Sequence, residues 1–79
     1  MEKSKGPQPL VEVYGDRRVL VEHHSGVLEN SGEAVTVKAR FGLIRVRGEK
    51  LCFARMTGEQ LVICGRIGGV ELIRGGSHG

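Results

Sequence analysis

The sequence contains no tryptophan, and aromatic residues make up only 4% of its 79 residues. Tyr14, Phe41 and Phe53 are the whole aromatic set. Small nucleic-acid platforms stack bases on exposed aromatic side chains, so this scarcity argues against that function. The core has to be built mostly from valine, leucine and isoleucine, which pack well on a pleated sheet surface.

Long apolar runs are also missing. No stretch reaches the roughly 18 consecutive apolar residues that a transmembrane helix needs. The first ten residues, MEKSKGPQPL, lack the apolar segment of a signal peptide. We therefore expect the chain to remain in the cytoplasm, where it is made.

Cysteine is scarce, with Cys52 and Cys64 the only two, and both lie in apolar segments. In a cytosolic chain the simplest expectation is two reduced, buried thiols. Their spacing matches no standard zinc motif, and the adjacent His23 and His24 would point to opposite faces of a strand. We predict no metal site, no cofactor and no catalytic residue, and hence a protein that is not an enzyme.

Glycine is abundant, at 13 residues, and most glycines separate short runs of alternating apolar residues. The runs between residues 18 and 73 are RVLVE, VLEN, AVTVKA, LIRVR, LCFARM, LVIC and VELI. Alternation with a period of two is typical of half-buried strands, and glycine suits the turns between them. The segment GRIGG at 65–69 is read in the same way, as turn glycines, because no helix or lysine follows to complete a phosphate loop.

These runs predict an all-β fold, a small single-domain antiparallel meander of the roll or sandwich type. A short β-solenoid-like stack fits the same periodicity, since the segments resemble one another loosely. A helix over LCFARMTGEQL competes locally, but Gly58 in its middle disfavours it. The expected organisation is a disordered segment over 1–9, one β-domain over 10–73 and a flexible tail over 74–79.

Charge is mildly basic, with a formal net charge of +3 from 12 basic and 9 acidic residues. In AVTVKARF and LIRVR the cations fall on the polar side of two consecutive strands, and LCFARM adds a run that is apolar on both faces except for one arginine. The predicted interaction surface comprises Lys38, Arg40, Arg45, Arg47, Phe53 and Arg55, and Arg17, Arg18 and Arg66 could extend it. Such a surface suits an acidic partner or phospholipid headgroups; the alternative is a small basic β-barrel that binds nucleic acid.

Several segments together carry a resemblance to the YabP/YqfC family of sporulation proteins, and more to its YqfC branch. They lie between residues 15 and 72, in the order RVLVEHHSG, VLENS, FGLIRVRG, the spaced pattern L-x-F-x-x-M-T at 51–57, and LVICGRI. The chain departs from the family pattern at His23, where we expect asparagine, and at Asn30, where an aromatic residue is usual.

The resemblance implies a small cytoplasmic protein made in the mother cell during endospore formation. It also implies a working relationship with a membrane protein of the YqfD type, and it supplies no catalytic residue. We expect a non-enzymatic assembly or adaptor protein that self-associates, with no small-molecule substrate. An enzyme or metal protein using His23, His24, Cys52 or Cys64 is the remaining alternative.

Overall fold

The structure is a computed structural model that describes residues 10–75. The disordered segment predicted over 1–9 and residues 76–79 of the predicted tail lie outside the described residues. Within 10–75 the chain forms strands and no helix. The strands are β1 (Leu10–Tyr14), β2 (Arg18–Glu22), β3 (Gly26–Asn30), β4 (Ala34–Ala39), β5 (Gly42–Met56) and β6 (Gln60–Arg74).

All six strands belong to one sheet, in the order β1-β2-β6-β5-β4-β3, and every pair is antiparallel. The predicted all-β antiparallel fold is confirmed, and the chain is not a stack of solenoid rungs. The spatial order departs from the chain order at one place, because β2 pairs with β6 rather than with β3. A short link over residues 23–25 connects β2 to β3.

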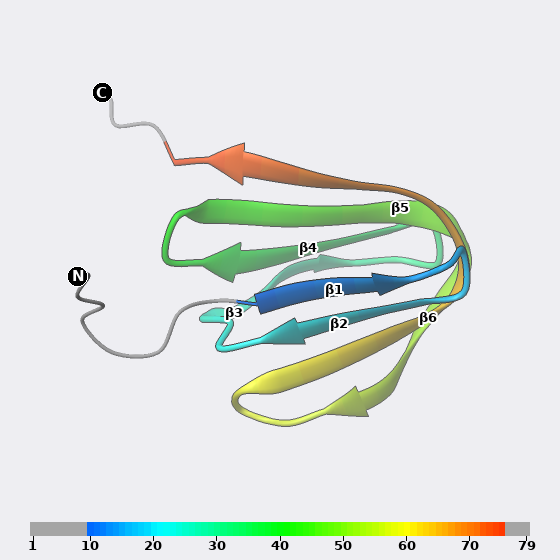
Figure 1. Cartoon of the computed structure of the whole chain (residues 1–79), viewed down its shortest axis with the longest axis horizontal. Coiled ribbons are helices and arrows are strands. Elements are labelled where there is room, and N and C mark those ends of the chain that lie inside the picture. Colours follow the sequence, from blue (N-terminus) through cyan, green and yellow to red (C-terminus); the bar gives the residue numbers. More distant parts are fainter. Residues whose placement is uncertain (1–9, 76–79) are drawn as a thin grey trace.

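The sheet bends over on itself, because β5 and β6 each turn sharply near their middle (Figure 1). The first layer contains β1, β2, residues 60–64 of β6 and residues 52–56 of β5. The second layer contains β3, β4, residues 42–47 of β5 and residues 69–74 of β6. Each long strand therefore contributes to both layers, and the sheet does not close into a barrel.

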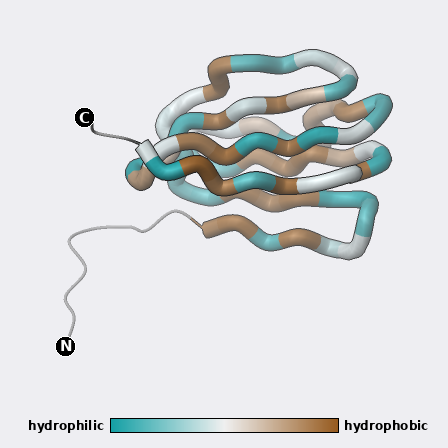
Figure 2. The backbone as a smooth tube through the Cα atoms, turned by 90° about the horizontal axis from the view of Figure 1, so that it is seen from above, coloured by the Kyte–Doolittle hydropathy of each residue, from teal (hydrophilic) through white to brown (hydrophobic). Residues whose placement is uncertain are grey.

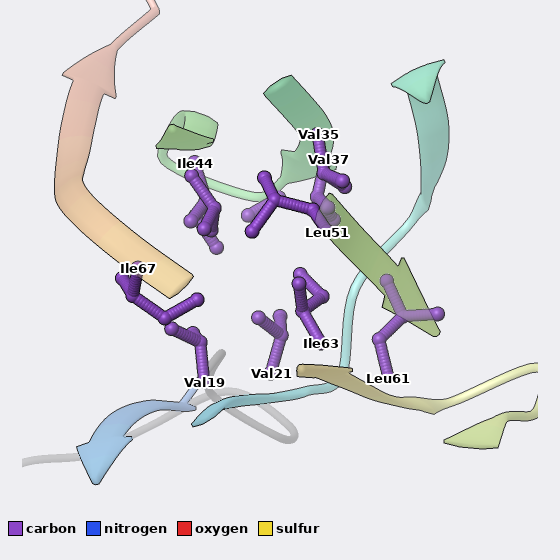
Figure 3. Packing of buried hydrophobic residues seen from close by; sticks show 11 residues of the cluster. Val19, Val21, Val35, Val37, Ile44, Leu51, Leu61, Ile63 and Ile67 are labelled. Atoms are coloured by element: carbon purple, nitrogen blue, oxygen red, sulfur yellow. The ribbon is translucent and has the colours of Figure 1, made fainter. Parts of the chain in front are cut away.

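The core lies between the two layers and is entirely aliphatic. Its members from the first layer are Val19, Val21, Leu61 and Ile63; those from the second layer are Val35, Val37, Ala39, Ile44 and Val46; Leu51 and Ile67 lie near the bend. Figure 3 shows these side chains converging from both sides. Burying one such side chain stabilises the fold by about 1.5–3 kcal/mol.

The alternation seen in the sequence is what makes this packing possible. Along the strands, apolar and polar residues alternate, so that brown and teal segments follow one another in Figure 2. In β4 the side chains of Val35, Val37 and Ala39 are buried, while Lys38 between them is exposed. Ile44 and Val46 of β5 are buried in the same way, as the sequence predicts.

Two glycines allow β5 and β6 to approach closely at the bend. A Cβ on Gly48 would overlap the carbonyl oxygen of Arg66, and a Cβ on Gly65 would lie 2.6 Å from the carbonyl oxygen of Lys50. Gly65 also has a φ of +133°, which L side chains rarely adopt. The ladder shifts register on either side of this point, between Arg47 and Gly48 and again between Glu49 and Cys52. Such bulges bend a strand and increase its twist.

One local interpretation of the sequence is therefore wrong. The segments 48–50 and 65–69 are not turns between strands but the bent middles of β5 and β6. In the run LCFARM, whose sequence is apolar on both faces except for one arginine, only Leu51 is buried and the outer face is left exposed. The turn interpretation failed because glycine permits a tight turn and a close backbone approach equally well, and the sequence alone does not separate them.

Replacing Gly48 with alanine should lower the free energy of unfolding by about 1–3 kcal/mol, because the added methyl group forces the two bent strands apart. Gly32→Ala is the matched control, since no atom of residues 10–75 outside its chain neighbours lies within 4 Å of a Cβ at that position. It should change stability by less than about 0.5 kcal/mol. Urea unfolding followed by circular dichroism measures both values, and equal midpoints for the two variants would refute the close-approach argument.

Candidate interaction surface

Three of the predicted cations share the outer face of the second layer. Lys38 lies on β4, and Arg45 and Arg47 lie on the paired segment of β5. Their neighbours along each strand are buried in the core, so successive side chains alternate between the core and the outside. The structure thus brings half of the predicted interaction surface together.

Acidic residues accompany these cations on the same face. The Nε of Arg45 donates a hydrogen bond of 3.3 Å to Oγ1 of Thr36, whose hydroxyl donates one of 2.8 Å to Oε1 of Glu29. On the other side, Arg45 lies opposite Glu71 of β6 in the register. Thr36 is only 3% exposed, whereas Arg45 is half-buried and Glu29 is exposed. The face therefore carries both signs of charge, which disfavours a nucleic-acid-binding surface.

The other three predicted residues lie elsewhere. Arg40 is in the turn between β4 and β5. Phe53 is half-buried and packs against the core. Arg55 is exposed on β5 in the first layer, opposite Val62. The six residues do not form one continuous patch, because β5 carries its two halves into different layers.

A second group of cations surrounds a hollow of about 640 Å³ at the bend. It is lined by Asp16, Arg17, Arg18, Glu49, Lys50, Cys64, Gly65 and Arg66. The turn after β1 lies against the bend of β6, where the amide of Ile67 donates a hydrogen bond of 2.8 Å to the carbonyl of Asp16. The ion pairs Arg17–Asp16 (3.8 Å) and Arg66–Glu49 (3.9 Å) are largely exposed and hold their partners only weakly.

The sequence suggested Arg17, Arg18 and Arg66 as an extension of the first surface, but they gather at this separate hollow. Lys50 joins them and was not singled out. The available signal was that these cations lie in or directly beside the breaks between apolar runs, at 16–18, 49–50 and 65–66. Only the bend of the sheet brings those breaks to one place.

The histidine pair has a structural role in the link between β2 and β3. The amide of Gly26 donates a hydrogen bond of 3.0 Å to Nδ1 of His24, so Nε2 carries the proton and donates one of 3.3 Å to the carbonyl of Thr57. The amide of His23 donates to the carbonyl of Glu59. The link is thereby attached to the turn between β5 and β6.

The two cysteines are not buried as the sequence suggested, since Cys52 is exposed and Cys64 is half-buried. Both lie near the bend, whereas His23 and His24 follow the opposite end of β2. The described residues contain no group of three or more histidine, cysteine or acidic side chains that could hold a metal ion.

The first strand carries an exposed hydrogen bond between side chains on its outer face. The hydroxyl of Tyr14 donates to Oε1 of Glu12 over 2.6 Å. This hydrogen bond to a carboxylate stabilises the protonated phenol and raises the pKa of Tyr14 above its ordinary value.

In the comparison with protein families, residues 5–79 match the model described as the YabP family. Comparison with curated proteins and with solved structures found no match. Among the described residues there is no helix that is long and apolar enough to cross a membrane.

Replacing His24 with alanine should destabilise the fold by about 1 kcal/mol, because both side-chain hydrogen bonds are lost. His23→Asn is the control: His23 has a φ of 62°, a conformation that asparagine tolerates. Thermal unfolding of the two variants provides the comparison. A His24 variant as stable as the control would contradict the structural role.

Replacing Glu12 with alanine should lower the pKa of Tyr14 towards its ordinary value, since the carboxylate partner is removed. The chain has one tyrosine and no tryptophan, so a titration of phenolate absorbance reports on this group alone. Glu59→Ala, in the turn after β5, should leave the titration curve in place. An unshifted curve for the Glu12 variant would show that the hydrogen bond does not form in solution.

Proposed function

The chain belongs to the YabP family, and from this premise we propose that it is a non-enzymatic assembly or adaptor protein of endospore formation. It acts in the cytoplasm of the mother cell as a homo-oligomer. It works with a membrane protein, for which the resemblance to the YqfC branch suggests a partner of the YqfD type. It takes no small-molecule substrate, and its surfaces serve protein contacts.

The observation that carries this proposal is an open edge on β6. On the edge of β6 that faces away from β5, residues 60–64 pair with β2. The amide of Ile67 makes the final backbone hydrogen bond along this edge, to the carbonyl of Asp16. No described strand pairs with residues 68–74 on that edge. The same residues keep an unbroken register with β5 on their other side, from Gly69 to Arg74. A straight, unpaired edge is a template for another strand.

The other edges are less suited to pairing. β1 and β3 have only five residues each, and β3 contains a bulge between Val27 and Glu29. The free edge of β5 also shifts register, between Phe53 and Arg55. Bulges and short lengths are the usual means by which sheet edges avoid association.

The side chains along the β6 edge also favour association. Leu72 lies opposite the buried Ile44 in the register, yet it is 61% exposed, because none of the described strands pairs with β6 beyond it. Ile73 is 36% exposed. A second copy of this strand, antiparallel and centred on Leu72, would place Val70 opposite Arg74 and Glu71 opposite Ile73. That register avoids like charges facing each other and covers the leucine.

Sedimentation analysis should show that the wild-type chain self-associates, and Leu72→Lys should weaken that association by at least about tenfold. Leu28→Lys is the matched control, since Leu28 is 60% exposed but lies on the bulged strand β3. It should associate like the wild type. A wild-type chain that stays monomeric at high concentration would refute the assembly proposal.

The same pair of variants tests the role in spores. In an endospore-forming bacterium that lacks the gene, the Leu28 variant should restore heat-resistant spores and the Leu72 variant should not. If both variants restore spore formation equally, assembly through β6 is not required for the function.

A further inference from the structure

Cys52 and Cys64 are direct partners across the ladder of β5 and β6 in the first layer. Their neighbours Leu51 and Ile63 are buried in the core, so both thiols project from the outer face of the sheet. Cys52 is exposed and Cys64 half-buried. The two cysteines therefore lie side by side on the outer face of the sheet.

The spacing of partners in an antiparallel ladder suits a disulfide bond. Residues directly opposite each other have Cα atoms about 4.5–5.5 Å apart. Disulfide bonds span Cα separations of about 4.4–6.8 Å. The backbone on both sides is anchored, since the amide of Leu51 donates to the carbonyl of Gly32 over 2.8 Å and the amide of Gly65 to that of Arg17 over 3.3 Å. The two thiols can meet without a rearrangement of the sheet.

The surroundings of Cys64 attract anions. Cys64 lies opposite Arg18 of β2 on its other side and forms part of the wall of the hollow at the bend. The same hollow is lined by Arg17, Lys50 and Arg66, against two acidic residues. A cationic hollow of this kind raises the local concentration of anionic small molecules.

We propose that Cys52 and Cys64 form a dithiol site that is oxidised to a cross-strand disulfide by anionic low-molecular-weight disulfides entering the hollow. The thiolate of Cys64 attacks one sulfur of the reagent, the reagent's S–S bond breaks, and one reagent thiolate leaves. The thiolate of Cys52 then attacks the Cys64 sulfur of the mixed disulfide and displaces the second. The protein gives up two electrons to the reagent, and the two cysteine protons pass to the two released thiols.

The new bond would join the two strands next to their bend. It would close the chain around the turn at 57–59 and connect the neighbours of Leu51 and Ile63, which belong to the core. Cross-links of this kind restrict the unfolded chain, so the oxidised protein should unfold at a higher temperature than the reduced one. Reduction would reverse the change.

The test uses the full chain, reduced and then exposed to oxidised glutathione, which is anionic at neutral pH. The reaction is run at high dilution, and the product is analysed by mass spectrometry without reductant. The monomeric chain should be lighter by two hydrogens and contain no free thiol. Cys52→Ser should instead retain one glutathione on Cys64. Thiols that stay free, or only intermolecular dimers and glutathione adducts on the wild-type chain, would overturn the proposal.

A second measurement tests the role of the hollow. Arg18→Gln should slow oxidation by glutathione disulfide at low salt by at least about threefold, but leave the rate with the neutral bis(2-hydroxyethyl) disulfide unchanged. Arg47→Gln, on the outer face of the second layer, is the charge-matched control and should alter neither rate. If Arg18→Gln slows oxidation by both reagents equally, or changes neither rate, electrostatic entry through the hollow is refuted.

Discussion

The close approach of β5 and β6 at their bend is the constraint on which the rest of the structure depends. Gly48 and Gly65 each face backbone of the other strand, where a side chain would not fit. Because both strands bend together, the sheet can fold into two layers and enclose an aliphatic core. The same bend places the turn after β1 against β6 and forms the cation-lined hollow.

The bend also explains how charge is distributed over the surface. β5 carries Arg45 and Arg47 in one layer and Arg55 in the other, so cations that are close in the sequence face different directions. On the outer face of the second layer, Glu29 lies to one side of Arg45 and Glu71 to the other. This face therefore has mixed charge. Around the hollow beside Cys64, four cations face only two acidic residues, so the charge there is less balanced.

The sequence predicted individual strands well and their connections less well. In AVTVKARF the core-facing positions Val35, Val37 and Ala39 could be assigned from the sequence, because alternation reflects which side chains face the core, although Thr36 on the other side is also buried. At Gly48 and Gly65 the prediction of turns was wrong, because the reason for glycine there is the opposite strand, which is distant in the chain. The exposure of Cys52 was missed because its side chain lies on the outer face of the sheet, beside Cys64, rather than toward the core.

The sequence by itself determined the fold class, the alternation of buried and exposed residues, and the resemblance that the family match confirms. Each of these properties follows from short segments of the chain taken in order. They can therefore be predicted without knowing which strands pair. Only the tertiary structure decided that β2 pairs with β6, that Cys52 lies opposite Cys64, and which cations share a surface. Those are pairings between distant segments, selected by how the bent sheet buries its aliphatic face, and no single segment encodes them.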